Sequence, residues 1–186
     1  MEGKLLIQNG RVLPMTGKVI PKGSVLVENG KITAVAERIE VPDTGSTEII
    51  DASGCLVMPG LIEAHCHVGI TEEKKGMEGD DCNENVSPVT PWLRAIDAVN
   101  TMDAAFDDAV RAGITSIMAG PGSSNVVGGQ FAFIKTKGRR IDDLIVKAPA
   151  AMKIAFGENP KVNFSGQEKS PVTRMAIAGI LREELH

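Results

Sequence analysis

The sequence predicts an α/β protein in which a β-rich N-terminal region precedes alternating strands and helices. The N-terminal part carries short runs of β-branched residues separated by Asn-Gly pairs, which is typical of strands joined by tight turns. Pro59-Gly60 ends this pattern. Beyond that pair, strand-like runs alternate with helix-like runs, and this alternation favours a parallel sheet.

Two Asn-Gly pairs, Asn9-Gly10 and Asn29-Gly30, each predict a β-hairpin, because these residues tolerate positive φ at both central turn positions. β-Branched residues occupy both arms around the second pair. The strands expected in this region are residues 25–28, 31–35, 48–51 and 55–58. Taken alone, such patterns are typical of surface hairpins that take no part in binding or catalysis.

The run Leu61–Val68 follows the Pro-Gly pair and alternates partly between apolar and polar residues, which is compatible with a largely buried strand. A polar stretch then extends from Thr71 to about Pro91. Connections of this length inside compact domains are usually functional covers or disordered segments.

A helix is expected from Thr101, a capping residue, to the stop signal at Gly113. Its inner face would carry Met102, Ala105, Phe106, Ala109 and Val110. The later elements are a strand at 114–119, a glycine-rich loop at 120–129, a strand at 131–135, an ambiguous segment at 141–147, a short buried strand at 152–156 and a helix from Ser170 with Pro171 in its first turn. The chain ends inside this last helical pattern, which predicts that it is truncated.

Composition argues against several classes of function. The chain has 186 residues, a formal net charge of −4 and no long basic run, which opposes a nucleic-acid-binding surface. Its apolar stretches are too short to span a bilayer, and its N-terminus lacks a signal-peptide pattern. The cysteines, Cys55, Cys66 and Cys82, lack CxxC spacing and fit a reducing cytosol. We therefore expect a cytoplasmic protein that binds neither nucleic acid nor membrane.

His65 and His67 are two of the three histidines in the sequence, and one residue separates them. On a strand, residues i and i+2 point to the same face, roughly 6.5–7 Å apart, so two imidazoles there can approach one cation. Cys66 would point the opposite way and fill space in the core. The spacing alone also allows a pair of hydrogen-bonded structural histidines.

The run DASGCLVMPGLIEAHCH, from Asp51 to His67, resembles the opening of the amidohydrolase superfamily. In that family a small β-sandwich leads through a Pro-Gly turn to the first strand of a (β/α)8 barrel, which ends in His-x-His. The earlier runs LIQNG and VENGKI resemble the family's first strands, and residues 112–115 and 121–130 resemble its imidazolonepropionase-like branch. The resemblance covers essentially the whole chain.

The resemblance implies a small β-sandwich subdomain at residues 1–57, followed at residues 58–186 by the first part of a TIM-like (β/α)8 metal-dependent hydrolase barrel. His65 and His67 would be metal ligands at the C-terminal end of the first barrel strand. Glu158 is the preferred bridging ligand, and Lys153 is the competing candidate. One or two divalent ions are expected, zinc first, with iron and manganese also open. The family's catalytic Asp and later histidines have no counterpart in this sequence.

The implied activity is hydrolysis of a non-peptide carbon–nitrogen bond, in a cyclic amide, small amide or amidine, by a metal-activated water. The partner would be such a small-molecule substrate. Two alternatives stay open: a catalytically dead barrel homologue with a structural or ligand-binding role, and a metal-dependent, prolidase-like dipeptidase. We expect the chain itself to be inactive, because it lacks the later ligands. We also expect it to self-associate, because an unclosed barrel exposes sheet edges.

Overall fold

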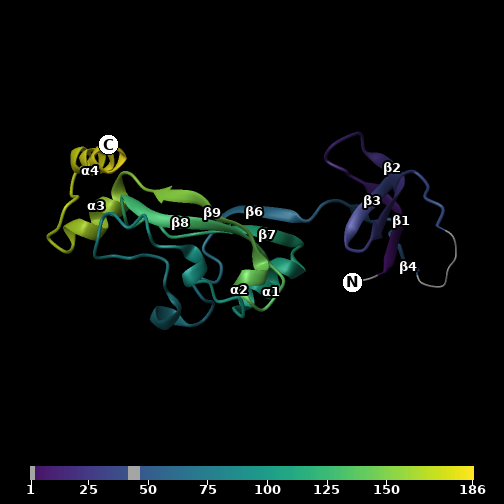
Figure 1. Cartoon of the computed structure of the whole chain (residues 1–186), viewed down its shortest axis with the longest axis horizontal. Coiled ribbons are helices and arrows are strands. Elements are labelled where there is room, and N and C mark those ends of the chain that lie inside the picture. Colours follow the sequence, from purple (N-terminus) through teal and green to yellow (C-terminus); the bar gives the residue numbers. More distant parts are fainter. Residues whose placement is uncertain (1–2, 42–46) are drawn as a thin grey trace. The chain divides into compact units, whose positions relative to one another are not determined.

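The computed structural model describes residues 3–41 and 47–186, and the chain forms two compact units, Met1–Pro59 and Gly60–His186 (Figure 1). The first unit contains strands only. The second contains a sheet together with all the α-helices of the described residues. The division falls at the Pro59-Gly60 pair, where the sequence pattern changes.

The first unit is a five-stranded sheet with strand order β3-β2-β1-β4, in which β5 also pairs with β1. β2 is antiparallel to β1 and β3, whereas β4 and β5 run parallel to β1. The strands are β1 (Lys4–Val12), β2 (Ile20–Glu28), β3 (Lys31–Ala36), β4 (Thr47–Asp51) and β5 (Leu56–Val57). A sandwich has two facing sheets, and the described residues of this unit supply one of them.

The two Asn-Gly pairs have different structures. Asn29 and Gly30 both have positive φ, 51° and 76°, and they join β2 to β3 as a hairpin, as expected. The hairpin expected at Asn9-Gly10 is wrong, because this pair lies inside β1 at a register shift in its pairing with β2. Asn9 alone of the two takes positive φ there, 65°, and its side-chain amide donates to Asp51 Oδ1 at 2.9 Å. One such residue makes a bulge rather than a turn.

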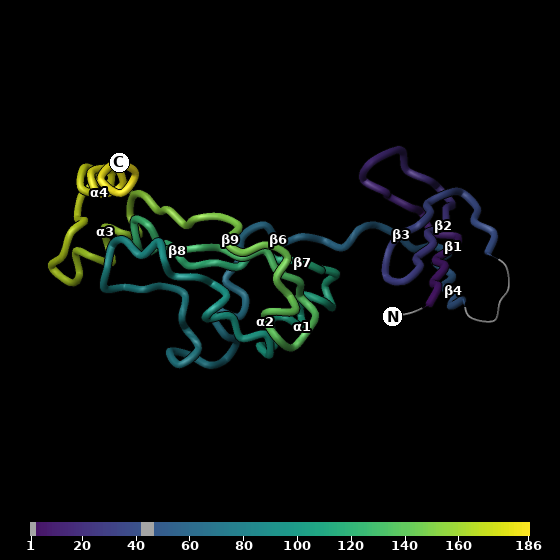
Figure 2. The backbone as a smooth tube through the Cα atoms, in the orientation of Figure 1, coloured from purple at the N-terminus to yellow at the C-terminus, as the bar shows by residue number. Residues whose placement is uncertain are grey.

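The second unit is built on a four-stranded sheet with order β6-β7-β8-β9 (Figure 2). β6 and β7 are parallel, as expected, but β8 is antiparallel to both of its neighbours. The sheet is therefore mixed, because a short glycine-rich connection joins β7 to β8 and a parallel crossover needs a dozen or more residues. The strands are β6 (Leu61–Cys66), β7 (Ile114–Ala119), β8 (Val127–Lys135) and β9 (Ile145–Ile154).

The two outer strands of this sheet are more exposed than the sequence suggested. Every β6 side chain from Leu61 to His65 is exposed, so the expectation of a largely buried strand is wrong there. The segment 152–156 is not a short buried strand either, since it belongs mainly to the ten-residue strand β9 and exposes 41% of Met152 and 62% of Phe156. Both strands lie at sheet edges, where a neighbouring strand covers one side only.

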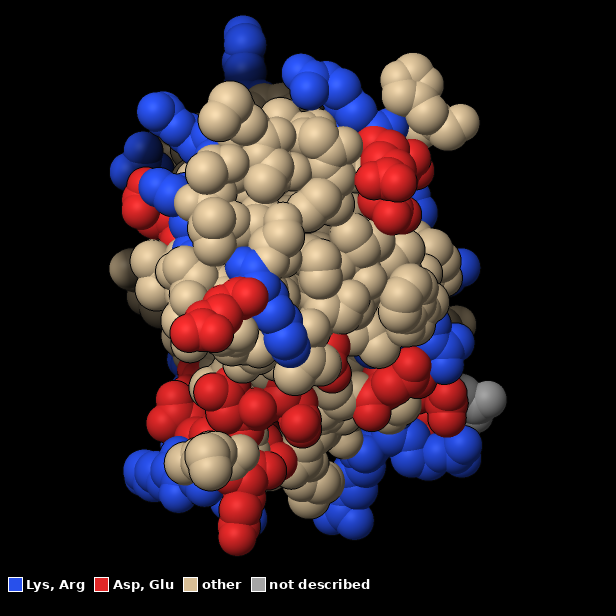
Figure 3. Space-filling view, turned by 90° about the vertical axis from the view of Figure 1, so that its left-hand side faces the viewer, with Lys and Arg blue, Asp and Glu red and all other residues tan. Residues whose placement is uncertain are grey.

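Helices α3 and α4 lie at one end of the second unit (Figure 1). Figure 3 views the molecule from that side and shows acidic side chains gathered below a broad uncharged surface. α4 begins at Arg174 rather than near Ser170, because the hydroxyl of Thr173 accepts the N–H of Ala176 and caps the helix. No helix in residues 3–41 and 47–186 is long and apolar enough to cross a membrane. The remaining helical bounds are α2 (Ile141–Leu144), α3 (Glu158–Ser165), α4 (Arg174–Leu185) and the 3-10 turns Gly76–Gly79 and Ala95–Asp97.

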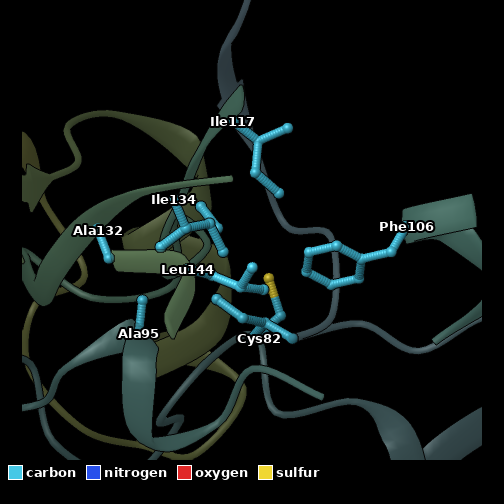
Figure 4. Packing of buried hydrophobic residues seen from close by; sticks show 9 residues of the cluster. Cys82, Ala95, Phe106, Ile117, Ala132, Ile134 and Leu144 are labelled. Atoms are coloured by element: carbon cyan, nitrogen blue, oxygen red, sulfur yellow. The ribbon is translucent and has the colours of Figure 1, made fainter. Parts of the chain in front are cut away.

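The core of the second unit lies where helix α1 (Ala104–Arg111) meets the sheet (Figure 4). Phe106 of this helix is 3% exposed and belongs to one cluster with side chains of β7 and β8. The long polar segment after β6 also contributes, since Cys82 is buried in the same cluster. The buried members are Ile70, Cys82, Ala95, Phe106, Ile117, Ala119, Ala132, Ile134 and Leu144.

The start of α1 differs from the expectation. Asp103, not Thr101, is the N-cap, and its carboxylate accepts the backbone N–H groups of Ala105 and Glu73. The Thr101 hydroxyl instead donates to the carbonyl of Arg139. Because the helix begins later, Met102 precedes it and is 68% exposed, outside the predicted inner face.

Candidate metal site

His65 is the penultimate residue of β6, and His67 follows the strand directly. The two ring centroids lie 5.6 Å apart with the planes at 88°. Cys66, between them, points the other way: its Sγ donates to the carbonyl of Met118 at 3.6 Å, and its side chain packs against the core. The alternation expected of a strand therefore brings the two imidazoles close together and separates them from the thiol.

His67 is held in one tautomer by the backbone of Gly120, the residue that follows β7. Its Nδ1 lies 2.7 Å from the carbonyl oxygen of Gly120. A carbonyl oxygen can only accept a hydrogen bond, so Nδ1 carries the proton in this contact. The lone pair of the neutral ring is then on Nε2, which is the arrangement found in metal-binding histidines whose other nitrogen donates to a backbone carbonyl.

His65 lies against an aromatic ring and beside a cation. Its centroid is 5.1 Å from that of Phe131, and it lines a pocket of about 290 Å³ together with Lys153. The pKa of His65 is lowered from its ordinary value of 6.5, first because partial burial disfavours the charged ring and then because of the charges of Lys153 and His67. Glu63, two residues earlier on β6, opposes this shift. The environment therefore favours neutral imidazole, the form that binds metals.

Replacing Lys153 by Met is expected to raise the pKa of His65 towards 6.5, because a positive charge that opposes protonation is removed. In the wild type the folded chain binds this proton less readily than the unfolded chain. The stability linked to His65 is therefore present above about pH 6.5 and lost as the pH falls towards the lowered value. The substitution should weaken this pH dependence.

An NMR titration of the imidazole signals measures this effect. Lys147→Met is the matched control, since Lys147 is exposed on the same strand and contributes nothing to the shift of His65. It should leave the His65 titration unchanged. Identical titrations in the wild type and in Lys153→Met would contradict the role given to Lys153.

The two candidate bridging residues have different surroundings. Lys153 is half-buried on β9 and lines the pocket that His65 also lines. Glu158 begins α3, is 78% exposed and pairs with Lys161 at 3.3 Å. The structure thus brings Lys153, and not Glu158, into the pocket beside His65.

The imidazole pair is not a complete ligand set. In the described ranges, no group of three His, Cys, Asp or Glu side chains is placed to hold a metal ion. A zinc site normally has at least three protein ligands. The donors of the pair fit a divalent ion, whose other positions in this chain would be filled by water, whereas a complete site needs further protein ligands.

Sequence reasoning missed Gly120 and Phe131, the residues that contact the two histidine rings. Both lie in segments that the sequence marked only as a glycine-rich loop and a strand. The only sequence signal was a glycine directly after β7. Its partners depend on strand pairing, which the sequence does not display.

These observations define the class of protein. A β-rich unit leads through a Pro-Gly pair to a parallel strand, at whose end two imidazoles lie 5.6 Å apart, and this order resembles the opening of an amidohydrolase barrel. A scan against models of protein families finds no match. Comparison with individual proteins does find relatives.

The chain is 34% identical over 166 residues to the amidohydrolase TasK of Hapsidospora irregularis, covering 82% of this chain and 17% of that protein. It is 28% identical to a dihydroorotase of Elusimicrobium minutum, over 98% of this chain and 45% of the relative. The solved structure of an amidohydrolase from Thermotoga maritima matches with a TM-score of 0.90 and 43% identity, over 96% of this chain and 46% of that one.

The chain belongs to the amidohydrolase superfamily. It spans less than half the length of each of these three relatives.

Proposed function

We propose that this chain is the metal-binding opening of a barrel enzyme that hydrolyses carbon–nitrogen bonds other than those of ordinary peptides. The observation that carries the proposal is the pair of imidazoles 5.6 Å apart. His67 is held through its Nδ1 proton, so its lone pair is on Nε2. Relatives named amidohydrolase, dihydroorotase and deaminase support the reaction class. The substrate class is a cyclic amide, small amide or amidine.

We propose His65 and His67 as ligands of one or two divalent ions, zinc first, with iron or manganese as alternatives. A divalent ion bound there supplies a nucleophile at neutral pH by lowering the pKa of a water, and it polarises the bond to be cleaved. For the bridging position, Lys153 has more support than Glu158, because it lines the pocket beside His65 while Glu158 pairs with Lys161 in solvent. It would bridge as a carbamate, since the ammonium form has no lone pair to offer a metal.

The residues of this chain have three tasks in the proposed reaction. Gly120 holds the ring of His67 in the tautomer that leaves Nε2 free. Before metal binds, desolvation of His65 and the charge of Lys153 lower the pKa of that imidazole, which favours its neutral form. The pocket beside His65 accepts a small molecule, with apolar walls from Met118 and Phe131. The remaining ligands and the proton-transferring Asp belong, in this proposal, to the part of the relatives that this chain does not span.

A hybrid protein tests the proposal. Residues 1–186 replace the matching 46% of the Thermotoga maritima amidohydrolase, and the hybrid is assayed with zinc or manganese against cyclic amides, small amides, amidines and dipeptides. We expect cleavage of a non-peptide carbon–nitrogen bond, and loss of that activity in His65→Ala.

The alternatives give different results in the same assay. Activity on dipeptides alone would favour a prolidase-like enzyme. A folded, metal-loaded hybrid that cleaves nothing would favour a dead homologue and contradict the proposal.

We further propose that the chain is cytoplasmic and that it self-associates. What supports association is the open edges of the second sheet, where Ile62 of β6 is 62% exposed and Met152 of β9 is 41% exposed. Edge strands with unpaired backbone groups and apolar side chains recruit further strands.

A further inference from the structure

Gly120 lies directly after β7 and makes two hydrogen bonds near the end of β6, one with the backbone and one with a side chain. Its N–H donates to the carbonyl of Cys66 at 3.2 Å. Its own carbonyl accepts the Nδ1 proton of the His67 ring at 2.7 Å. One residue therefore contacts both the carbonyl just before His67 and the imidazole itself.

Phe131 occupies the space that a side chain at position 120 would fill. In the β7–β8 ladder Ala119 pairs with Ala132, so the next residues, Gly120 and Phe131, come to lie beside each other. A Cβ on Gly120 would overlap the ring of Phe131. An aromatic ring over a glycine is a recognised cross-strand device in antiparallel sheets. The position of the Phe131 ring therefore requires glycine at position 120.

The Phe131 ring also contacts the second histidine. Its centroid lies 5.1 Å from that of His65 with the planes at 62°, an edge-on arrangement in the favourable range for aromatic pairs. Phe131 is only 5% exposed and is fixed between β7 and β9, whereas the His65 side chain is exposed. The rigid ring therefore restricts the mobile one.

We propose that Gly120 and Phe131 are a pair of positioning residues that orient both imidazoles towards one ion. Gly120 orients His67 through its carbonyl, and its missing side chain admits the ring that orients His65. The positioning role rests on the proposed metal site, because it is a role in orienting metal ligands. The contacts themselves do not depend on a metal, so the two ideas can fail separately.

Phe131→Leu should release His65 and leave His67 in place, because Leu keeps apolar volume at position 131 but loses the flat ring edge. We expect a roughly 10- to 100-fold weaker zinc affinity, as is typical when a group supporting a ligand is lost. Gly120→Ala should disturb both histidines, since its Cβ displaces the Phe131 ring and moves the carbonyl that holds His67. The double variant should recover the His67 contact, because Leu leaves room for the added methyl group.

The test uses the 186-residue chain in two measurements. The first is metal-free NMR of the imidazole rings: the tautomer of His67 from nitrogen shifts, and the nuclear Overhauser effect between the His65 and His67 rings. With three histidines in the sequence, substitution assigns each signal. The second is a zinc titration of the same samples.

Matched controls separate positioning from general loss of stability. Phe164→Leu changes a fully buried phenylalanine of α3, and Gly179→Ala adds a Cβ that meets nothing within 4 Å. Both should leave the ring-to-ring signal, the tautomer and the zinc affinity unchanged, although Phe164→Leu lowers stability.

The outcomes are distinguishable. Loss of the ring-to-ring signal together with weaker zinc binding in Phe131→Leu, but not in Phe164→Leu, supports the pair. An unchanged ring-to-ring signal and unchanged zinc affinity in Phe131→Leu would overturn it. Loss of the ring signal in a series where even the wild type does not bind zinc would support the positioning contacts and contradict the proposed metal site.

Discussion

Replacing His67 by Ala is expected to abolish measurable zinc binding by this chain, with an affinity loss of at least about 100-fold. This exceeds the roughly 10- to 100-fold cost of losing a supporting group, because a ligand itself is removed. His65 then remains as a single imidazole, and one imidazole does not compete with water for a divalent ion. His65→Ala should have the same effect, since the two rings lie 5.6 Å apart and each is proposed to bind the same ion.

Competition of the protein with a coloured zinc chelator measures this affinity. His186→Ala is the control, since His186 is the third histidine and lies at the end of α4, outside the pocket of His65. It should bind zinc like the wild type. Equal affinities for His67→Ala and His186→Ala would show that zinc binds elsewhere.

Phe106→Ala should destabilise the second unit by about 3–5 kcal/mol, the usual cost of deleting a buried aromatic side chain. Phe106 is 3% exposed and is the contact through which α1 joins the core under the sheet (Figure 4). Removing its ring leaves a cavity in a closely packed cluster that includes Ile117 of β7 and Ile134 of β8.

Urea unfolding followed by tryptophan fluorescence checks this value. Trp92 is the single tryptophan and belongs to the second unit, so its signal reports on that unit. Phe156→Ala is the control, because Phe156 is 62% exposed and its loss should cost far less. If both variants unfold at the same urea concentration, the packing described for α1 is incorrect.

Local sequence chemistry predicted the parts of the fold that local chemistry determines. Asn29-Gly30 makes a hairpin because both residues take positive φ, and β6 follows Pro59-Gly60 as expected. Asn9-Gly10 has the same two residue types but makes a bulge, because its conformation depends on pairing with β2 and on the hydrogen bond from Asn9 to Asp51. A residue pair cannot report such distant partners.

Exposure was the least predictable property of the second unit. β6 has an apolar sequence at Leu61 and Ile62, which predicts burial, yet it lies at a sheet edge where these side chains are exposed. The direction of β8 was missed for a related reason. Strand direction depends on the length of the connection and on the neighbours that a strand finds, and residue type records neither.

In the candidate site, too, the sequence predicted the features set by local geometry and missed those set by strand pairing. The i, i+2 spacing of His65 and His67 predicted rings on one side of a strand, and their closeness follows from strand geometry alone. The contact of His65 with Phe131 and the nearness of Lys153 depend on how β8 and β9 align with β7. Glu158 attracted attention because it follows a strand-like run, but it opens a helix and pairs with Lys161.

X-ray absorption at the zinc edge tests the central claim most directly. In the zinc-loaded wild-type chain we predict scattering from two imidazole nitrogens at about 2.0–2.1 Å, and we expect this signal to be lost in His65→Ala and in His67→Ala. A zinc spectrum without imidazole scattering, or one that neither substitution alters, would contradict the claim that these two rings bind a common ion.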